Sequence, residues 1–435
     1  MKQRIFFSFL ILLFLPFIQQ LFSIVSEKSL DGIEPAGDPP PFSLLLWLNG
    51  DYQKEYDLYN QKKIGFHNTF VRLHNQINYT VFNMSDAGDN VIGKEGYLYL
   101  KPYINAFTGA DFLGREYIEI QSEKIKTIQE VLKKNNIDFF VAFAPGKGSF
   151  YPEYIPDNYK KKKFQDTNYE YYIKKFRDDG VAFLDLQALF SKAKKTEKYP
   201  LYSTTGVHWT QYGCYIAGSA LVSYIEQLRK IKLPAIKLQS VELLSLSGNK
   251  SNDYDAATLM NTFTTFPHSK LAFPKLSYES DSTTVKPHFL CISDSYFPGI
   301  MKTGIPENVF TDYHNWLYYD RAFPESFVKQ KKIDKKHLKK ELEKNDVICI
   351  MATDAELPIF PFGFVDDAYE LYAKKDDAYY NLKRRDLVCF IHEAYRNMKS
   401  NKEWEKQIIE SAKTNGISEA QQIVNSALWL YNQKN

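Results

Sequence analysis

The sequence has 435 residues, of which 44% are hydrophobic and 25% are charged. This length is sufficient for a large core, and the composition is typical of a globular chain rather than a disordered one. The 55 basic and 52 acidic residues give a net charge of +3, and the lysines are dispersed. Nucleic acid is therefore excluded as the main partner, because phosphate binding requires a concentrated basic face.

The N-terminus carries a membrane-targeting pattern within residues 1–25. Lys2 and Arg4 precede an apolar run from Ile5 to Val25, and acidic residues follow the run. The basic flank is expected to stay in the cytoplasm while the rest of the chain is exported. The run is at the short end for a bilayer span, but it lacks a small-x-small cleavage site, which favours an uncleaved signal anchor over a cleaved signal peptide.

Two segments of different character follow the apolar run. Residues 26–50 are predicted to be a linker, because Gly32 to Pro41 is rich in proline and glycine. From Asp51 to Phe82 the apolar residues recur at roughly helical spacing. Gly93 to Leu100 is typical of a turn that enters a strand.

From residue 118 onward, predicted helices alternate with short apolar strands. Helical spacing covers 118–134, 169–179 and 212–230, and strand patterns cover 138–144, 181–186, 289–292 and 347–351. This alternation predicts an α/β fold with a doubly wound, mainly parallel sheet. We assign the α/β body to residues 51–374.

The C-terminal residues 375–435 contain no strand pattern. Three helices are expected there, at 383–398, 401–414 and 418–431. We therefore predict a small helical appendage after the α/β body.

No pattern for a metal, a cofactor or a disulfide framework is found. The cysteines at 214, 291, 349 and 389 lie far apart in apolar stretches and are expected to be buried, although one disulfide stays open in an oxidising compartment. Gly146-Lys147-Gly148-Ser149 lacks the earlier glycine of a phosphate loop, and His314 has no metal-ligand spacing around it. Neither a cofactor nor a metal is predicted.

A serine at the end of a predicted strand is the first candidate for catalysis. Ile292-Ser293-Asp294-Ser295-Tyr296 directly follows the strand that begins at Phe289. A serine on a sharp turn at this place exposes its hydroxyl in the crevice where open α/β sheets bind ligands, and its backbone N–H can face a developing oxyanion. An ordinary polar turn or helix cap is the structural alternative.

A histidine on a loop before a helix is the second candidate. His208 stands beside Trp209 and shortly before the helix that starts near Tyr212. A serine nucleophile needs a neighbouring base, and imidazole has a suitable pKa for that task. The alternative is a structural histidine. Arg321, in Tyr318-Tyr319-Asp320-Arg321, is a further candidate for sugar contact, with a structural loop as its alternative.

The serine and histidine segments, in this order, resemble the alginate O-acetyltransferase family of the AlgX/AlgJ type, a circularly permuted relative of the SGNH hydrolases. His208-Trp209 matches that family's Asp-x-His-Trp motif, and Asp294-Ser295 matches its later Gly-Asp-Ser motif. Two differences stand out. Gly206 occupies the place of the motif's aspartate, and Ser293 replaces the glycine. A backbone carbonyl or a distant aspartate is then needed to hold the second ring nitrogen of the histidine.

Two further segments carry the same resemblance. Gly93 to Tyr99 is similar to the family's Gly-Lys-Asp-Gly-Trp-Leu-Phe entry strand, and Pro145 to Glu153 is similar to its Pro-x-Lys and Tyr-Pro-Glu loop. The similarity extends from about Asp51 to Asp367 and is patchy between Leu233 and Lys286.

The resemblance implies an SGNH-hydrolase-like fold in which Ser295 is the nucleophile and His208 its base. Asp294, Trp209 and Arg321 are candidate supporting residues. The implied activity is acetyl transfer to an exported polysaccharide, with a membrane-bound O-acyltransferase as the donor relay. The implied location is the inner membrane, with the catalytic domain in the periplasm. A carbohydrate acetyl esterase and a catalytically decayed carbohydrate-binding protein are the alternatives.

Overall fold

A six-stranded sheet forms the centre of the body in the computed structural model, which describes residues 2–33, 37–160, 166–245, 252–267, 269–328, 331–372, 390–391, 393–394, 397 and 401–434. The strand order is β4-β3-β10-β7-β8-β9, and only the β8–β9 pair is antiparallel. The strands are β3 (Asp138–Ala144), β4 (Phe183–Asp185), β7 (His288–Ser293), β8 (Asp312–Leu317), β9 (Arg321–Phe323) and β10 (Val347–Thr353). The predicted mainly parallel α/β sheet is confirmed.

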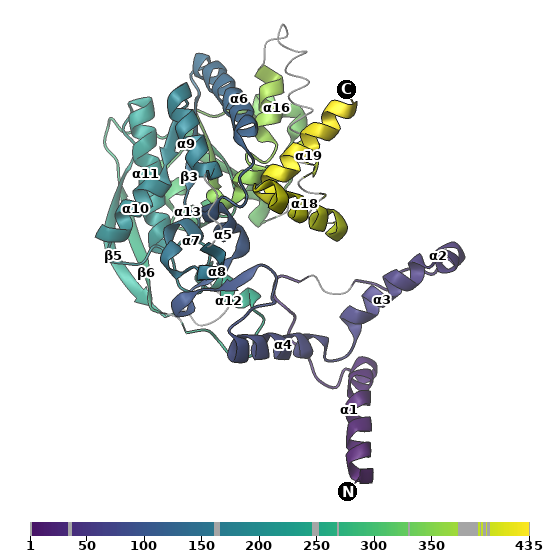
Figure 1. Cartoon of the computed structure of the whole chain (residues 1–435). Coiled ribbons are helices and arrows are strands. Elements are labelled where there is room, and N and C mark those ends of the chain that lie inside the picture. The colour runs from purple at the N-terminus through teal and green to yellow at the C-terminus, as the bar shows by residue number, and fades with distance from the viewer. Residues whose placement is uncertain are drawn as a thin grey trace.

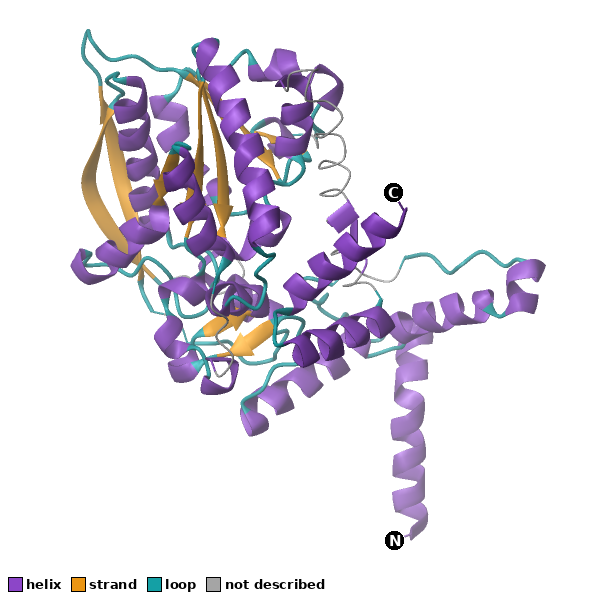
Figure 2. Cartoon of the chain, turned by 45° about the horizontal axis from the view of Figure 1, so that its top comes forward, coloured by secondary structure: helices purple, strands orange, loops and turns teal. Residues whose placement is uncertain are grey.

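Helices cover both faces of this sheet (Figure 2). One face carries α6 (Arg115–Lys134), α9 (Asn168–Asp179) and α16 (Phe364–Tyr372), and the other carries α10 (Leu186–Thr196), α11 (Gln211–Arg229), α13 (Phe297–Met301) and α14 (Ile305–Val309). Side chains along β3 alternate between the two cores, with Phe139 and Val141 in the first and Phe140 and Ala142 in the second. Burial on both faces explains why the central strands are continuous apolar runs.

Smaller elements surround the carboxyl edge of the sheet. They are β1 (Asn90–Ile92), β2 (Leu98–Leu100), α5 (Lys101–Thr108), α7 (Lys147–Phe150), α8 (Asp157–Lys160) and α12 (Asp255–Leu259), whereas α15 (Leu338–Leu342) leads into the start of β10 at the opposite edge. A separate antiparallel ribbon of β5 (Ala235–Leu244) and β6 (Leu271–Glu279) lies at one side of the body (Figure 1). The short helix α12 falls in the connection between these two ribbon strands, within the region where the sequence resemblance is patchy.

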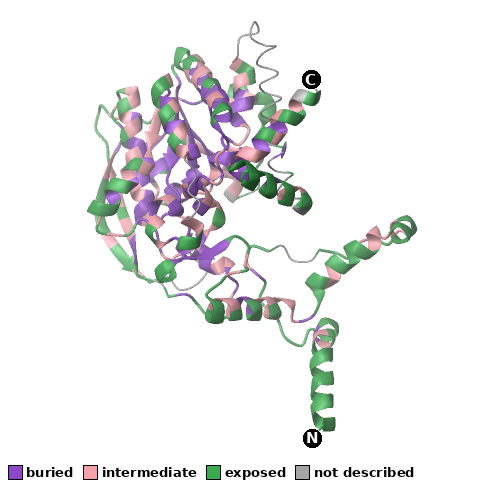
Figure 3. Ribbon diagram, in the orientation of Figure 1, coloured by how far each residue is buried: buried purple, intermediate pink, exposed green. Residues whose placement is uncertain are grey.

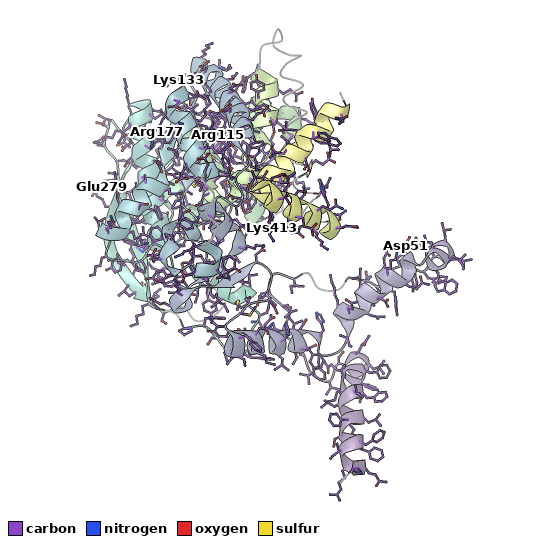
Figure 4. All side chains as sticks on the ribbon, viewed as in Figure 1. Asp51, Arg115, Lys133, Arg177, Glu279 and Lys413 are labelled. Atoms are coloured by element: carbon purple, nitrogen blue, oxygen red, sulfur yellow. The ribbon has the colours of Figure 1, made fainter. Side chains whose placement is uncertain are left out.

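Four N-terminal helices extend from the body and are largely exposed (Figure 3). They are α1 (Lys2–Phe22), α2 (Leu44–Asn49), α3 (Asp51–Lys63) and α4 (His67–Phe82). By length and composition, α1 is able to cross a membrane. Asp51, at the start of α3, lies far out on the arm that α2 and α3 form (Figure 4). Within the predicted linker, the backbone carbonyls of Lys28 and Ser29 accept hydrogen bonds from α4, so part of that segment is docked.

Two C-terminal helices pack beside α6. They are α18 (Lys402–Asn415) and α19 (Glu419–Lys434), close to the predicted positions of the last two helices. Ile423 and Val424 are buried in the same core as α6, and Ser418 Oγ donates to the carbonyl of Phe112. Most of the helix predicted at 383–398 lies outside the described residues. The domain limits at 374 and 375 remain a prediction.

Candidate active site

Ser295 follows β7 on a turn that a buried carboxylate holds in place. The Asp294 carboxylate accepts hydrogen bonds from the backbone N–H and the hydroxyl of Thr353, at 2.7 and 2.8 Å, and from the backbone N–H of Tyr296 at 3.0 Å. These bonds join the ends of β7 and β10, while burial raises the pKa of Asp294. Asp294 therefore shapes the turn, and Ser295, which is only partly buried, lies at the carboxyl edge of the sheet.

His208 meets Ser295 at this edge. The Nε2 atom of His208 lies 2.7 Å from Ser295 Oγ, although 87 residues separate the two positions. Thr210 caps the N-terminus of α11 through its hydroxyl and so fixes the end of the loop that carries the histidine. This distance suits proton transfer from an alcohol to a neutral imidazole.

The second ring nitrogen of His208 faces a carboxylate that the sequence did not identify. Asp255 Oδ2 forms a hydrogen bond with His208 Nδ1. The other oxygen, Oδ1, accepts from the backbone N–H groups of Val207 and Ala256 at 2.8 and 2.7 Å. Asp255 is the first residue of α12, and it supplies the carboxylate that Gly206 cannot.

The three side chains thus form a serine–histidine–aspartate arrangement. In such an arrangement the carboxylate fixes the tautomer of the imidazole and stabilises the imidazolium that forms when the serine is deprotonated. Asp255 and His208 are only partly exposed, with side-chain exposures of 25% and 20%. Partial shielding from water strengthens the interaction between them.

Lys147 supports the loop that precedes His208. Its side chain is fully buried, and its Nζ donates to the carbonyls of Thr204 and Gly206 at 2.8 and 2.7 Å. The rings of Tyr97 and Tyr99 lie 5.5 Å from this Nζ. Burial lowers the pKa of Lys147 to about 7, and the charge of Asp255 opposes that shift. The lysine of the sequence-predicted Pro-x-Lys loop therefore binds the backbone of the loop that carries the histidine.

Two aromatic side chains, Trp209 and Tyr296, pack next to the imidazole site. The buried Trp209 ring packs 4.9 Å from Phe190 and 5.0 Å from Tyr296, so it contributes to the core next to the site. The Tyr296 ring lies 4.8 Å from that of His208, and its hydroxyl donates to the carbonyl of Val207 at 2.6 Å. Tyr296 therefore restricts the orientation of the histidine, and Trp209 packs against Tyr296.

Tyr318 reaches Ser295 from the end of β8. It interacts with both the side chain and the backbone of Ser295, and burial raises its pKa to about 12. Its backbone N–H donates to the carbonyl of Ser293 at 2.7 Å, and its φ of 50° is unusual for a tyrosine. Tyr318, the first residue of the segment that is a candidate for sugar contact, therefore lies next to the serine. Arg321 is placed on β9, opposite Leu317, and its supporting role remains a prediction.

Comparisons with known proteins agree with this architecture. Residues 91–274 match the family model ALGX, described as the SGNH hydrolase-like domain of acetyltransferase AlgX, and this range contains Lys147, His208 and Asp255. A probable alginate O-acetylase AlgJ from Azotobacter vinelandii is 24% identical over 208 residues, which are 47% of this chain and 50% of the relative. The corresponding protein of Pseudomonas fluorescens is 24% identical over 178 residues, which are 41% of this chain and 43% of that relative. The chain thus spans about half the length of the curated relatives it matches.

Solved structures of similar proteins were also found. The O-acetyltransferase domain of Pseudomonas putida AlgJ shares 16% identity with a TM-score of 0.42, and the match covers 65% of this chain and 99% of that domain. Pseudomonas aeruginosa AlgX shares 15% identity with a TM-score of 0.41, covering 64% of this chain and 67% of that one. By the family model and the two curated relatives, part of this chain, including residues 91–274, is similar to the SGNH hydrolase-like domain of AlgX/AlgJ-type proteins.

Proposed function

We propose that this chain is an O-acetyltransferase that moves an acetyl group onto a polysaccharide hydroxyl through an acyl-enzyme on Ser295. The observation that carries the proposal is the contact of Ser295 Oγ with His208 Nε2 at 2.7 Å, with Asp255 on the other ring nitrogen. The matched family model, whose description names an acetyltransferase, supports the proposed acyl chemistry.

In the first half-reaction, Ser295 attacks the carbonyl carbon of an acetyl donor. His208 Nε2 takes the hydroxyl proton as the new bond between Oγ and the acyl carbon forms. When the tetrahedral intermediate collapses, the bond to the donor's leaving group breaks, and that group takes the proton from His208. Asp255 stabilises the imidazolium between these two events.

In the second half-reaction, His208 removes the proton of a sugar hydroxyl. The sugar oxygen attacks the acetyl carbon of the Ser295 ester, the bond to Oγ breaks, and Ser295 recovers its proton from His208. Because Ser295 accepts the acetyl group before the sugar reacts, the kinetics are expected to be of the ping-pong type. If water replaces the sugar, the same steps give an esterase.

Two donors are proposed for the oxyanion of each tetrahedral intermediate. The first is the backbone N–H of Ser295, and the second is the hydroxyl of Tyr318, which lies next to that serine. A phenol with a pKa of about 12 keeps its proton at physiological pH and therefore remains a donor. Fixed donors at the place where negative charge develops are a major source of catalysis.

The proposed acetyl donor rests on the resemblance to the AlgX/AlgJ-type proteins, and the proposed location rests on the apolar helix α1. With α1 as an anchor in the inner membrane, the body lies in the periplasm, on the side where an exported polysaccharide is found. A membrane-bound O-acyltransferase is the proposed relay for the acetyl group. Anchoring both proteins in one membrane raises their effective concentration for each other.

Acetyl transfer from a chromogenic ester tests the proposal. With an oligosaccharide acceptor, wild-type protein is expected to yield acetylated sugar, detected by mass spectrometry, and Ser295→Ala to yield none. Release of acetate with no acetylated sugar from any acceptor favours the esterase instead. A folded wild-type protein that neither transfers nor hydrolyses acetyl groups contradicts both.

A further inference from the structure

Helix α4 carries an exposed apolar stripe on the side that faces away from the body. Phe70, Leu73, Ile77 and Val81 are 48%, 47%, 46% and 67% exposed. Their spacing of three or four residues places all four on one side of the helix. This apolar stripe extends over most of α4.

The opposite side of α4 is polar and docked on the body. Arg72 donates from Nη1 and Nη2 to the carbonyls of Lys28 and Ser29, at 2.9 and 2.7 Å. Asn75 donates to the carbonyl of Met260 at 3.0 Å, and both Arg72 and Asn75 are buried. Rolling α4 to bury the apolar stripe breaks these bonds, so the stripe is fixed in its outward orientation.

The start of α4 lies directly against α1. A Cβ built on Gly65, two residues before α4, falls 2.1 Å from the carbonyl oxygen of Pro16 and 2.7 Å from the backbone nitrogen of Gln20. The backbones are therefore in contact at the end of α1 nearer the body. From this contact α1 runs away from the body, while α4 lies along the body's near side (Figure 1).

We infer that α4 lies in the surface of the membrane that α1 enters, with the apolar stripe inserted among the lipids. Helices α1 and α4 lie on the same side of the body (Figure 1), and both carry exposed apolar side chains, such as Phe17 at 56% exposure on α1, so one occupant covers both. An amphipathic helix gains free energy by burying such a stripe at the boundary between headgroups and acyl chains. The exposed Lys62 and Lys63, just before Ile64, suit anionic lipid headgroups at this depth.

This membrane contact also orients the candidate active site. On its inner side, α4 holds the segment that follows α12, through Asn75 to Met260 and through the Tyr79 and Phe266 rings, whose centroids are 4.7 Å apart. The first residue of α12 is Asp255. The position of the site above the bilayer is therefore set by two contacts, α1 and α4, rather than by one flexible tether.

A fluorescent label on the stripe tests this inference in the full chain. Leu73→Cys is labelled with the environment-sensitive dye NBD, and the protein is reconstituted into vesicles of phosphatidylcholine and phosphatidylglycerol. The matched control is Leu243→Cys, which is 50% exposed on β5, away from α1. Labelled wild-type protein gives the background, and Cys214, Cys291 and Cys349 are buried.

The label at position 73 is expected to emit at shorter wavelength, and nitroxide lipids are expected to quench it ~2-fold or more, since the stripe inserts below the headgroups. The label at position 243 keeps its emission. Emission at 73 that matches a water-exposed dye overturns the inference. Blue-shifted emission at 73 that nitroxide lipids leave unquenched also overturns it, because a protein surface, such as a second copy, then covers the stripe.

Discussion

Asp255 lies with its Oδ2 against the Nδ1 atom of His208, although 47 residues and the first strand of the β5–β6 ribbon separate them in sequence. The same carboxylate binds the backbone N–H of Val207 through Oδ1. It therefore fixes both the ring and the backbone of the histidine loop. Because Asp255 lies outside the histidine motif and supplies the carboxylate of the triad, catalysis does not require a side chain at Gly206.

Replacing Asp255 tests this relationship. Asp255→Asn keeps the shape of the side chain but favours the wrong tautomer of His208, so kcat for acetyl transfer is expected to fall by about 10⁴. Steady-state kinetics measure the loss, and circular dichroism checks the fold. Asp57→Asn, at an exposed position on α3, is the control and is expected to retain full activity. Wild-type kcat in Asp255→Asn contradicts a role for this carboxylate.

Removing the hydroxyl of Tyr318 tests the proposed oxyanion donor. Tyr318→Phe is expected to lower kcat by about 10²–10³ while KM changes little, because the hydrogen bond strengthens only in the transition state. Tyr319→Phe removes the same group from the adjacent tyrosine, whose ring packs against Trp316, and is expected to keep kcat within a small factor of wild type. Equal effects of the two substitutions argue against the assignment.

Lys147 is predicted to stabilise the fold and the histidine loop together. Lys147→Met removes the donor to the carbonyl of Gly206, at a cost of ~1–3 kcal/mol for a buried acceptor left unpaired, while the carbonyl of Thr204 keeps its bond from the backbone N–H of Leu98. Urea denaturation measures the free energy of unfolding, with Lys192→Met, on the exposed side of α10, as the control. Slower acylation of Ser295 in the folded Lys147→Met protein is expected because the loop loses its support. Unchanged stability and unchanged acylation contradict this account.

The lowered pKa of Lys147 gives a pH dependence with a definite sign. Above about pH 7 the folded lysine is neutral, while in the unfolded chain it keeps its proton up to its ordinary pKa. The unfolded state then binds more protons, so the free energy of unfolding rises with pH in this window. Wild-type stability, measured relative to Lys147→Met, is expected to increase between about pH 7 and pH 10. A difference that stays flat or decreases over this range contradicts the shift.

Much of the fold follows from the pattern of apolar runs. The strands predicted at 138–144 and 347–351 correspond to β3 and β10, because burial on both faces makes them apolar throughout. Strand β8, with the sequence Asp-Tyr-His-Asn-Trp-Leu, was not predicted, since it carries polar residues at its first half, which is exposed or only partly buried. The β5–β6 ribbon was also missed, because most of its side chains are partly or fully exposed and lack a buried period.

The candidate site was predictable only in part. Ser295 and His208 stand in local motifs, and the sheet topology brings both motifs to one edge. Asp255 has no motif around it, and its position depends on how the connection between β5 and β6 returns to the histidine loop. The contact of Tyr318 with Ser295 likewise depends on a left-handed backbone conformation at Tyr318, which cannot be predicted from the local sequence. Tertiary contacts of this kind are not encoded in local spacing.

Labelling with a fluorophosphonate probe measures the central claim most directly, because such a probe reacts with a serine only where a base activates it. The account predicts one adduct on wild-type protein, located at Ser295 by peptide mass spectrometry, with labelling lost in Ser295→Ala and strongly slowed in His208→Ala. Folded wild-type protein that stays unlabelled, or that is labelled on another serine while Ser295→Ala reacts equally well, contradicts it.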